Sequence, residues 1–186
     1  MTEIVVVLNN VRSVYNVGSV FRTCDAALIR PRATDGQAGV KKIYLVGVTP
    51  TPLDRFGKFR KDFSKVALGA EKTVEWEYFK NFGAAYKKLR SASGRTEILA
   101  VEQDKRSVPY YTISRSRNSV VKKVAPVSRE TRDKCALIFG EETKGLSKPV
   151  LDKCDKILEI PMRGRKESLN VSVAAGIVIY SLIFEK

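Results

Sequence analysis

Residues 158–186 read LEIPMRGRKESLNVSVAAGIVIYSLIFEK, and this stretch decides the fold. Its apolar start predicts a strand that Pro161 ends, and Gly164 then favours a turn. Ser168 is placed to cap a long helix, with Asn170 in the first helical turn. The helix is apolar nearly all round, so it must be buried, either inside the domain or against a partner subunit.

Short apolar runs alternate with helical patterns over the rest of the chain, which is typical of an α/β domain with a mainly parallel sheet. We expect strands over residues 4–8, 43–48, 74–79, 98–101, 136–139 and 157–160, and helices over 17–28, 82–91, 147–154 and 169–184. Two polar stretches, about 30–39 and 105–134, are interpreted as insertions. The length of 186 residues fits one domain spanning 1–186.

The charge of the chain is strongly positive. There are 34 Lys and Arg residues against 20 Asp and Glu residues, which gives a formal net charge of +14 and a pI near 9.8. This balance favours a polyanionic partner such as RNA or DNA. A generically basic protein without such a partner remains an open alternative.

The sequence contains no histidine. Ser-His-Asp and Cys-His nucleophile systems, HExxH zinc sites and the iron facial triad all need imidazole, so these classes of enzyme are excluded. Cys24, Cys135 and Cys154 form neither a CxxC nor a CxxH pattern, so we expect no zinc site, no other metal and no disulfide framework.

We expect a cytoplasmic protein without a membrane segment. The N-terminal apolar run has no basic stretch before it, which makes it a poor signal peptide and a good buried strand. The apolar C-terminus is interrupted by polar residues and is too short for a membrane span. We also expect no accessory RNA-binding domain before Ile4.

A second informative segment is LNNVRSVYNVGSVFRTCDAA, residues 8–27. We expect its buried strand to end in a polar turn at Asn16 and Gly18, followed by a helix that carries Arg22 on its second turn. The Asn16 amide and the Arg22 guanidinium would then face one ligand. An Asx-type turn beside a surface arginine explains the same residues.

The third segment is ALIFGEETKGLS, residues 136–147, in which a strand runs into Gly140, Glu141 and Glu142, and Gly145 opens a helix. Glycines allow close approach of backbone groups to a small ligand, and a carboxylate can orient a hydroxyl or an ammonium group. The pattern is not a Walker loop.

The longer insertion combines basic residues with Tyr110 and Tyr111, a combination that suits phosphate neutralisation and base stacking. A solvated loop without a ligand is the alternative. The side chains that we predict to bind RNA are Arg12, Arg22, Arg115, Arg117, Lys122 and Lys123.

In this order and at these spacings, the three segments resemble the SpoU class (TrmH-like) of RNA 2'-O-ribose methyltransferases in the SPOUT superfamily. The matching motifs are NVGSVFRTCDAA (16–27), FGEETKGLS (139–147) and IPMRGRKESLNVSVAA (160–175). The resemblance implies a Rossmann-like domain with a mainly parallel sheet and a deep C-terminal trefoil knot. It also implies a homodimer joined through the C-terminal helix, with the RNA site completed across the dimer.

The resemblance further implies that S-adenosylmethionine (AdoMet) donates a methyl group to a ribose 2'-hydroxyl in structured RNA, either tRNA or rRNA. The implied cofactor-binding residues are Val101, Gly140, Ile160, Met162, Ser168 and Leu169. The implied catalytic residues are Arg22, Asn16, Glu142, Ser168 and Asn170. Glu141 departs from the family, which commonly has a small or amide residue at this position.

Arg22 corresponds to the arginine that the family casts as the base. A guanidinium has a pKa above about 12, so it is a poor proton acceptor. Our hypothesis is that Arg22 binds phosphate and stabilises the developing alkoxide, while phosphate or water takes the proton. Two alternatives remain: an RNA-binding module that keeps the AdoMet pocket without turnover, and an NAD-type Rossmann protein, which would need a GxGxxG motif that is missing after the first strand.

Overall fold

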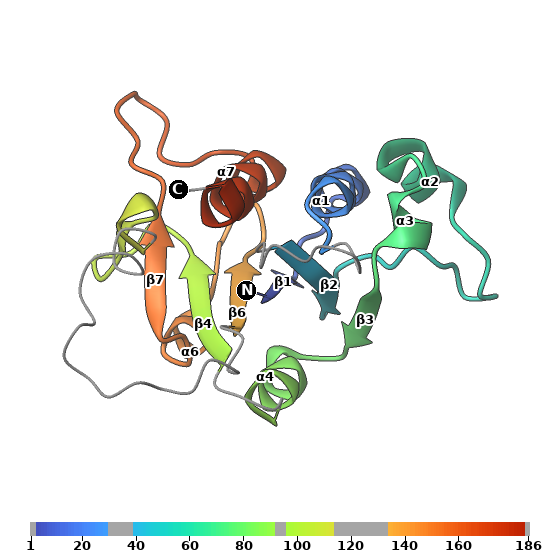
Figure 1. Cartoon of the computed structure of the whole chain (residues 1–186), viewed down its shortest axis with the longest axis horizontal. Coiled ribbons are helices and arrows are strands. Elements are labelled where there is room, and N and C mark those ends of the chain that lie inside the picture. The colour runs from blue at the N-terminus through green and yellow to red at the C-terminus, as the bar shows by residue number, and fades with distance from the viewer. Residues whose placement is uncertain (1–2, 30–38, 92–95, 114–133, 185–186) are drawn as a thin grey trace.

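The computed structural model describes residues 3–29, 39–91, 96–113 and 134–184. Their centre is a seven-stranded sheet in the order β3-β2-β1-β6-β4-β7-β5, and every strand pairing in it is parallel (Figure 1). The strands are β1 (Glu3–Asn9), β2 (Gly39–Val46), β3 (Trp76–Phe79), β4 (Thr96–Val101), β5 (Val108–Pro109), β6 (Lys134–Phe139) and β7 (Lys156–Glu159). The expected parallel α/β sheet is confirmed.

Helices cover both faces of this sheet. On one face α1 (Val14–Ala26) lies between α7 (Val171–Phe184) and the pair α2 (Lys61–Ala67) and α3 (Ala70–Thr73) (Figure 1). On the other face lie α4 (Phe82–Ser91) and α6 (Lys148–Leu151). Each face therefore has its own apolar core.

Burial on both faces explains why the central strands are continuous apolar runs rather than alternating ones. In β1, Ile4, Val6 and Leu8 enter the core under α1 and α7, whereas Val7 enters the core under α4. Burying one such side chain contributes about 1.5–3 kcal/mol relative to leaving it in water.

Helix α1 begins three residues earlier than expected, because the Ser13 hydroxyl caps it by accepting the N–H of Asn16. Asn16 and Gly18 therefore lie inside the helix, and the predicted turn at these residues is wrong. Gly18 has a packing role: a Cβ there would lie 2.9 Å from Cβ of Val66, so only glycine allows α1 and α2 to approach so closely.

Helix α7 also differs from the expectation at its start. Asn170, not Ser168, is the capping residue, since its Oδ1 accepts the N–H of Ser172 at 2.9 Å. Inside the fold the helix buries Ala175, Val178, Ile179 and Leu182. The opposite side leaves Val173, Tyr180 and Phe184 exposed, so the described residues cover only part of this apolar helix.

Several short elements escaped the sequence patterns: α2, α3 and the edge strand β5. Helix α6 is shorter than expected and begins at Lys148, so Gly145 lies in a turn before the helix rather than opening it. Most of both predicted insertions, 30–38 and 114–133, lies outside the described residues. No helix in the described ranges is long and apolar enough to cross a membrane. The cytoplasmic location stays a prediction.

Candidate active site

A pocket of about 480 Å³ opens at the carboxyl ends of β4, β6 and β7. This is where ligands bind in parallel α/β sheets. All six residues predicted to hold a cofactor line this pocket: Val101, Gly140, Ile160, Met162, Ser168 and Leu169. Glu142 and Asn170, two of the predicted catalytic residues, line it as well.

The wall formed by residues 140–145 requires two glycines. A Cβ on Gly140 would lie 2.6 Å from the backbone carbon of Gly145, so any larger residue would push the loop outward. Gly145 has a φ of +62°, and its N–H donates to the carbonyl of Glu141 at 3.0 Å. The close turn brings backbone groups to the pocket wall.

Sequence reasoning missed Glu102, which follows β4 directly and lines the pocket. Its Oε2 accepts the N–H of Leu146 at 2.7 Å and therefore holds the glycine loop against the end of β4. The neighbouring Gln103 donates from Nε2 to the carbonyl of Ile160 at 3.0 Å. Their position after a buried strand was a usable signal, because ligand-binding segments follow strands in such sheets.

One hydrogen-bonded chain joins the three sequence motifs. Asn16 donates from Nδ2 to Glu142 at 2.7 Å, and Asn170 donates from Nδ2 to Oδ1 of Asn16 at 3.0 Å. The Glu142 carboxylate also accepts the backbone N–H groups of Arg12 and Ser13. Asn16 therefore lies beside the pocket and orients two residues of its wall.

The surroundings of Glu142 favour its ionised form. Partial burial acts to raise its pKa, but the hydrogen bonds from Asn16 and from the backbone outweigh burial and hold the pKa below the ordinary value of 4.5. At neutral pH the group is thus a carboxylate whose oxygens accept hydrogen bonds from the protein. It positions Asn16 rather than serving as a strong base.

Arg22 projects from α1 in a different direction from Asn16, about 120° around the helix axis. Residues three and four apart on a helix are neighbours, and Arg22 lies between Gly18, which packs on α2, and Asp25, which accepts a hydrogen bond from Thr73 of α3. Its side chain is exposed, and it is not one of the pocket residues. Hydrogen bonds therefore join Asn16, Glu142 and Asn170, and Ser168 lines the same pocket. Arg22 is not among the residues that line this pocket.

The predicted RNA-binding residues have separate outcomes. The Arg12 guanidinium pairs with the Glu141 carboxylate at 3.3 Å, although most of its side chain is in solvent. Arg115, Arg117, Lys122 and Lys123 lie outside the described residues.

Residues 3–180 match the model of the SpoU rRNA Methylase family. The chain belongs to this family. A relative from Archaeoglobus fulgidus, named as an uncharacterized tRNA/rRNA methyltransferase, is 30% identical over 179 residues, which cover 96% of this chain and 63% of the relative. The tRNA (guanosine(18)-2'-O)-methyltransferase of Aquifex aeolicus is 27% identical over 96% of this chain and 67% of its own length.

Solved structures of SpoU proteins share the fold. The Aquifex aeolicus TrmH/SpoU tRNA modifying enzyme superposes with a TM-score of 0.66 and 26% identity, over 97% of this chain and 73% of that one. An AdoMet-bound rRNA methyltransferase from Sinorhizobium meliloti gives a TM-score of 0.71 at 24% identity, over 97% of this chain and 55% of that one. This SpoU chain thus spans a little over half to about three quarters of the relatives that it matches.

Proposed function

We propose that this chain transfers a methyl group from AdoMet to a ribose 2'-hydroxyl of tRNA or rRNA. The observation that carries the proposal is the pocket at the ends of β4, β6 and β7, which the second and third family motifs line together. The names of the relatives, which include tRNA and rRNA 2'-O-methyltransferases, support the reaction and the class of substrate.

The residues of the pocket fit AdoMet. A volume of about 480 Å³ lies within the range of small-molecule sites, which is about 300–1,000 Å³. Apolar walls come from Val101, Ile160 and Leu169, while Glu102 and Glu142 contribute negative charge beside a ligand that carries a sulfonium and an ammonium group. The close turn at Gly140 and Gly145 presents backbone groups that can bind polar edges.

The reaction needs alignment and removal of one proton. AdoMet, when bound, supplies an electrophilic methyl group. The 2'-oxygen forms a bond to this carbon as the carbon–sulfur bond breaks, and the hydroxyl proton passes to a substrate phosphate or to water. Asn170, Ser168 and Asn16 line or flank the pocket mouth, where they would hold the ribose.

The Arg22 guanidinium binds phosphate and stabilises negative charge on the 2'-oxygen in this proposal. Since the Arg22 side chain is exposed and does not line the pocket of its own chain, we place it at the pocket of a second subunit. The exposed apolar stripe of α7, with Val173, Tyr180 and Phe184, supports a homodimer joined through this helix. We also include the trefoil knot of the C-terminal segment in the proposal, on the strength of family membership.

Methyl transfer tests the proposal directly. The protein would be incubated with AdoMet that carries a labelled methyl group and with separated tRNA and rRNA, and the modified nucleotide would be mapped by its alkali-resistant linkage. We expect label in one of the two RNAs at a 2'-oxygen. Absence of label from both, with AdoMet bound, would favour the alternative of an RNA-binding module that retains the pocket.

A further inference from the structure

A rigid hairpin with an aromatic tip follows β2. Leu53 and Phe59 form an antiparallel bridge, and Asp54 N–H donates to the carbonyl of Lys58 at 2.8 Å. The Asp54 carboxylate accepts the N–H groups of Phe56 and Lys58, and Gly57 supplies the positive φ of +74° at the turn. The conformation of the tip is therefore fixed by its own backbone bonds.

Phe56 at this tip is 71% exposed, although exposing a large apolar ring to water is unfavourable. The guanidinium of Arg55 lies 4.7 Å from the centre of the Phe56 ring, and Lys72 lies 5.8 Å from the ring centre of Phe59. The chain thus presents two rings to solvent, each with a cation beside it.

The hairpin and the two helices after it carry an excess of positive charge, on Arg55, Lys58, Lys61, Lys65 and Lys72. None of these five is in an ion pair with a carboxylate of the described residues. The nearby acids are engaged elsewhere, since Asp54 binds the turn, Asp62 pairs with Arg60, and Glu71 is buried. We call Phe56, Phe59 and these five cations the hairpin patch.

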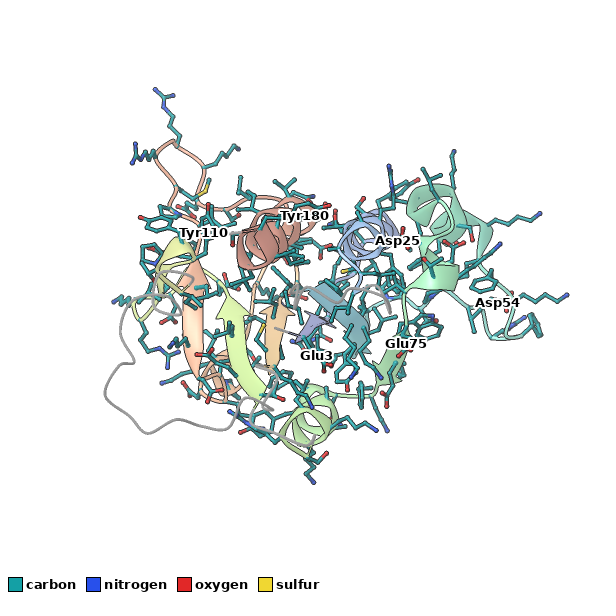
Figure 2. The ribbon with its side chains drawn as sticks, in the orientation of Figure 1. Glu3, Asp25, Asp54, Glu75, Tyr110 and Tyr180 are labelled. Carbon is teal, nitrogen blue, oxygen red and sulfur yellow. The ribbon has the colours of Figure 1, made fainter. Side chains whose placement is uncertain are left out.

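The hairpin patch lies on the same side of α1 as Arg22. Helix α2 begins at Lys61, directly after the hairpin, and packs on α1 at Gly18, one helical turn before the exposed Arg22. Figure 2 shows Asp54 at one end of the molecule and Tyr110 at the other. An RNA whose reacting nucleotide meets Arg22 would extend toward the patch.

We propose that the hairpin patch binds an unpaired segment of the RNA substrate, with a base stacked on Phe56 and the backbone phosphates held by the surrounding cations. This inference rests on the proposed RNA substrate. An exposed ring serves every base alike, whereas the five cations supply the sequence-independent attraction to phosphate. The locked turn lowers the entropy lost on binding.

Charge argues against a second copy of this chain as the occupant, because each copy carries a formal +14 and the patch itself is positive. An acidic protein is the other outcome of the test. An acidic protein would need an apolar side chain at position 56 but no aromatic ring, whereas a stacked base needs the ring. Replacing Phe56 by leucine or by tryptophan therefore distinguishes the two occupants.

The test measures the affinity of the full chain for a fluorescein-labelled, mixed-sequence single-stranded RNA of about 12 nucleotides. We expect Phe56→Ala and Phe56→Leu to weaken binding about tenfold or more, because both remove the stacking surface. Phe56→Trp should bind as the wild type does, and its added tryptophan fluorescence should be quenched on binding. The wild-type protein, whose one tryptophan is Trp76, gives the background fluorescence for this comparison.

Leu68→Ala is the matched control, since Leu68 is a 67% exposed apolar residue in the same basic neighbourhood without an aromatic ring. It should bind the single strand normally. A duplex of equal length, whose base faces are covered, should not distinguish Phe56→Ala from the wild type. Unchanged affinity in Phe56→Ala, normal affinity in Phe56→Leu, or an equal loss on the duplex would each overturn the stacking proposal.

Different results would contradict the RNA-binding role of the hairpin patch and the proposed methyl transfer. Normal methyl transfer to tRNA or rRNA by Phe56→Ala, at unchanged RNA concentration dependence, would overturn the patch and leave the activity intact. Loss of single-strand binding in this variant would support the patch even for a chain that transfers no methyl group.

Discussion

The amide of Asn16 donates to the carboxylate of Glu142 at 2.7 Å, across 126 residues of sequence. This contact fixes the start of α1 to the loop after β6, and the second bond from Asn170 fixes both to the start of α7. Three segments that share no secondary-structure element therefore meet through two amides and one carboxylate. The charge state of Glu142 should control how well they stay together.

Replacing Glu142 by glutamine should lower stability at neutral pH, because an amide can accept at only one oxygen and cannot replace the carboxylate toward Asn16, Arg12 and Ser13. The folded pKa of Glu142 is lowered, so its contribution is present above the ordinary value of 4.5 and is lost as the pH falls through the folded pKa. Thermal unfolding midpoints between about pH 3 and 7 should fall less steeply in the variant than in the wild type.

Glu75→Gln is the control for this comparison. The exposed Glu75 pairs with the partly buried Lys42 at 3.8 Å, a long ion pair at the surface, and such pairs contribute little to stability. Its midpoint should follow the wild type at every pH. A Glu142→Gln protein with the same acid sensitivity as the wild type would show that the carboxylate does not stabilise the junction.

The sequence was sufficient for those parts of the molecule that depend on local pattern and strand order. Buried strands are visible as apolar runs, and ligand segments follow their carboxyl ends, so the loop at Gly140 could be predicted from pattern. The other pocket residues, such as Ile160, were predicted only by the resemblance to the SpoU family. The direction in which a residue projects from a helix could not be predicted from these patterns, because it depends on where the helix begins. Placing the start of α1 three residues late put Asn16 in a turn and hid the fact that Asn16 and Arg22 share one helix and project about 120° apart around its axis.

Tertiary contacts explain the remaining differences. Ser168 and Asn170 are both good capping residues, and Asn170, which caps α7, also bonds Asn16 of a distant segment, a contact that no local pattern reveals. Glu102 has no motif around it, and its role comes from the loop that lies across the end of β4. The hairpin at Phe56 has polar and proline residues that suggest only a loop, whereas its rigidity comes from bonds to the Asp54 carboxylate.

Gly140→Ala should narrow the pocket that we propose for AdoMet. The added Cβ would lie 2.6 Å from backbone atoms of Gly145, which cannot move without shifting the whole loop. We expect a loss of about 1–3 kcal/mol in unfolding free energy and AdoMet binding too weak to measure by calorimetry. Gly164→Ala is the matched control, since a Cβ there meets nothing within 4 Å. Normal AdoMet binding by Gly140→Ala would refute the assignment of this wall.

Arg22→Ala should abolish methyl transfer while leaving AdoMet affinity unchanged, because Arg22 does not line the pocket of its own chain. Arg22→Lys should also lose most of its turnover, since an ammonium group cannot reproduce the planar fork of a guanidinium. Rates at saturating RNA, together with calorimetric AdoMet titration, separate the two effects. Near-full turnover and an unchanged pH profile in Arg22→Lys would show that the guanidinium fork is not needed.

Mixed dimers test whether Arg22 acts across subunits. Arg22→Ala keeps an intact pocket, and Gly140→Ala keeps Arg22, so a heterodimer has one site with both parts only if Arg22 crosses the interface. Equal co-expression should give half heterodimers and restore about a quarter of wild-type activity, although each variant alone is inactive. No recovery in heterodimers isolated with two affinity tags would place Arg22 at its own pocket.

The exposed stripe of α7 should be the subunit interface. Phe184 is 65% exposed, its ring lies 5.3 Å from that of Tyr180, and Val173 continues the same side of the helix. Tyr180→Glu would place a charge in this apolar contact, and burying an unpaired charge is costly, so we expect a monomer by light scattering after size exclusion. Leu68→Glu, at an exposed apolar residue on the α2 side, should remain a dimer. Because the monomer keeps its own pocket, it should still bind AdoMet but transfer no methyl group.

A Tyr180→Glu protein that stays dimeric would show that the interface does not lie on α7. A fully active monomer would show that Arg22 from a second subunit is not needed.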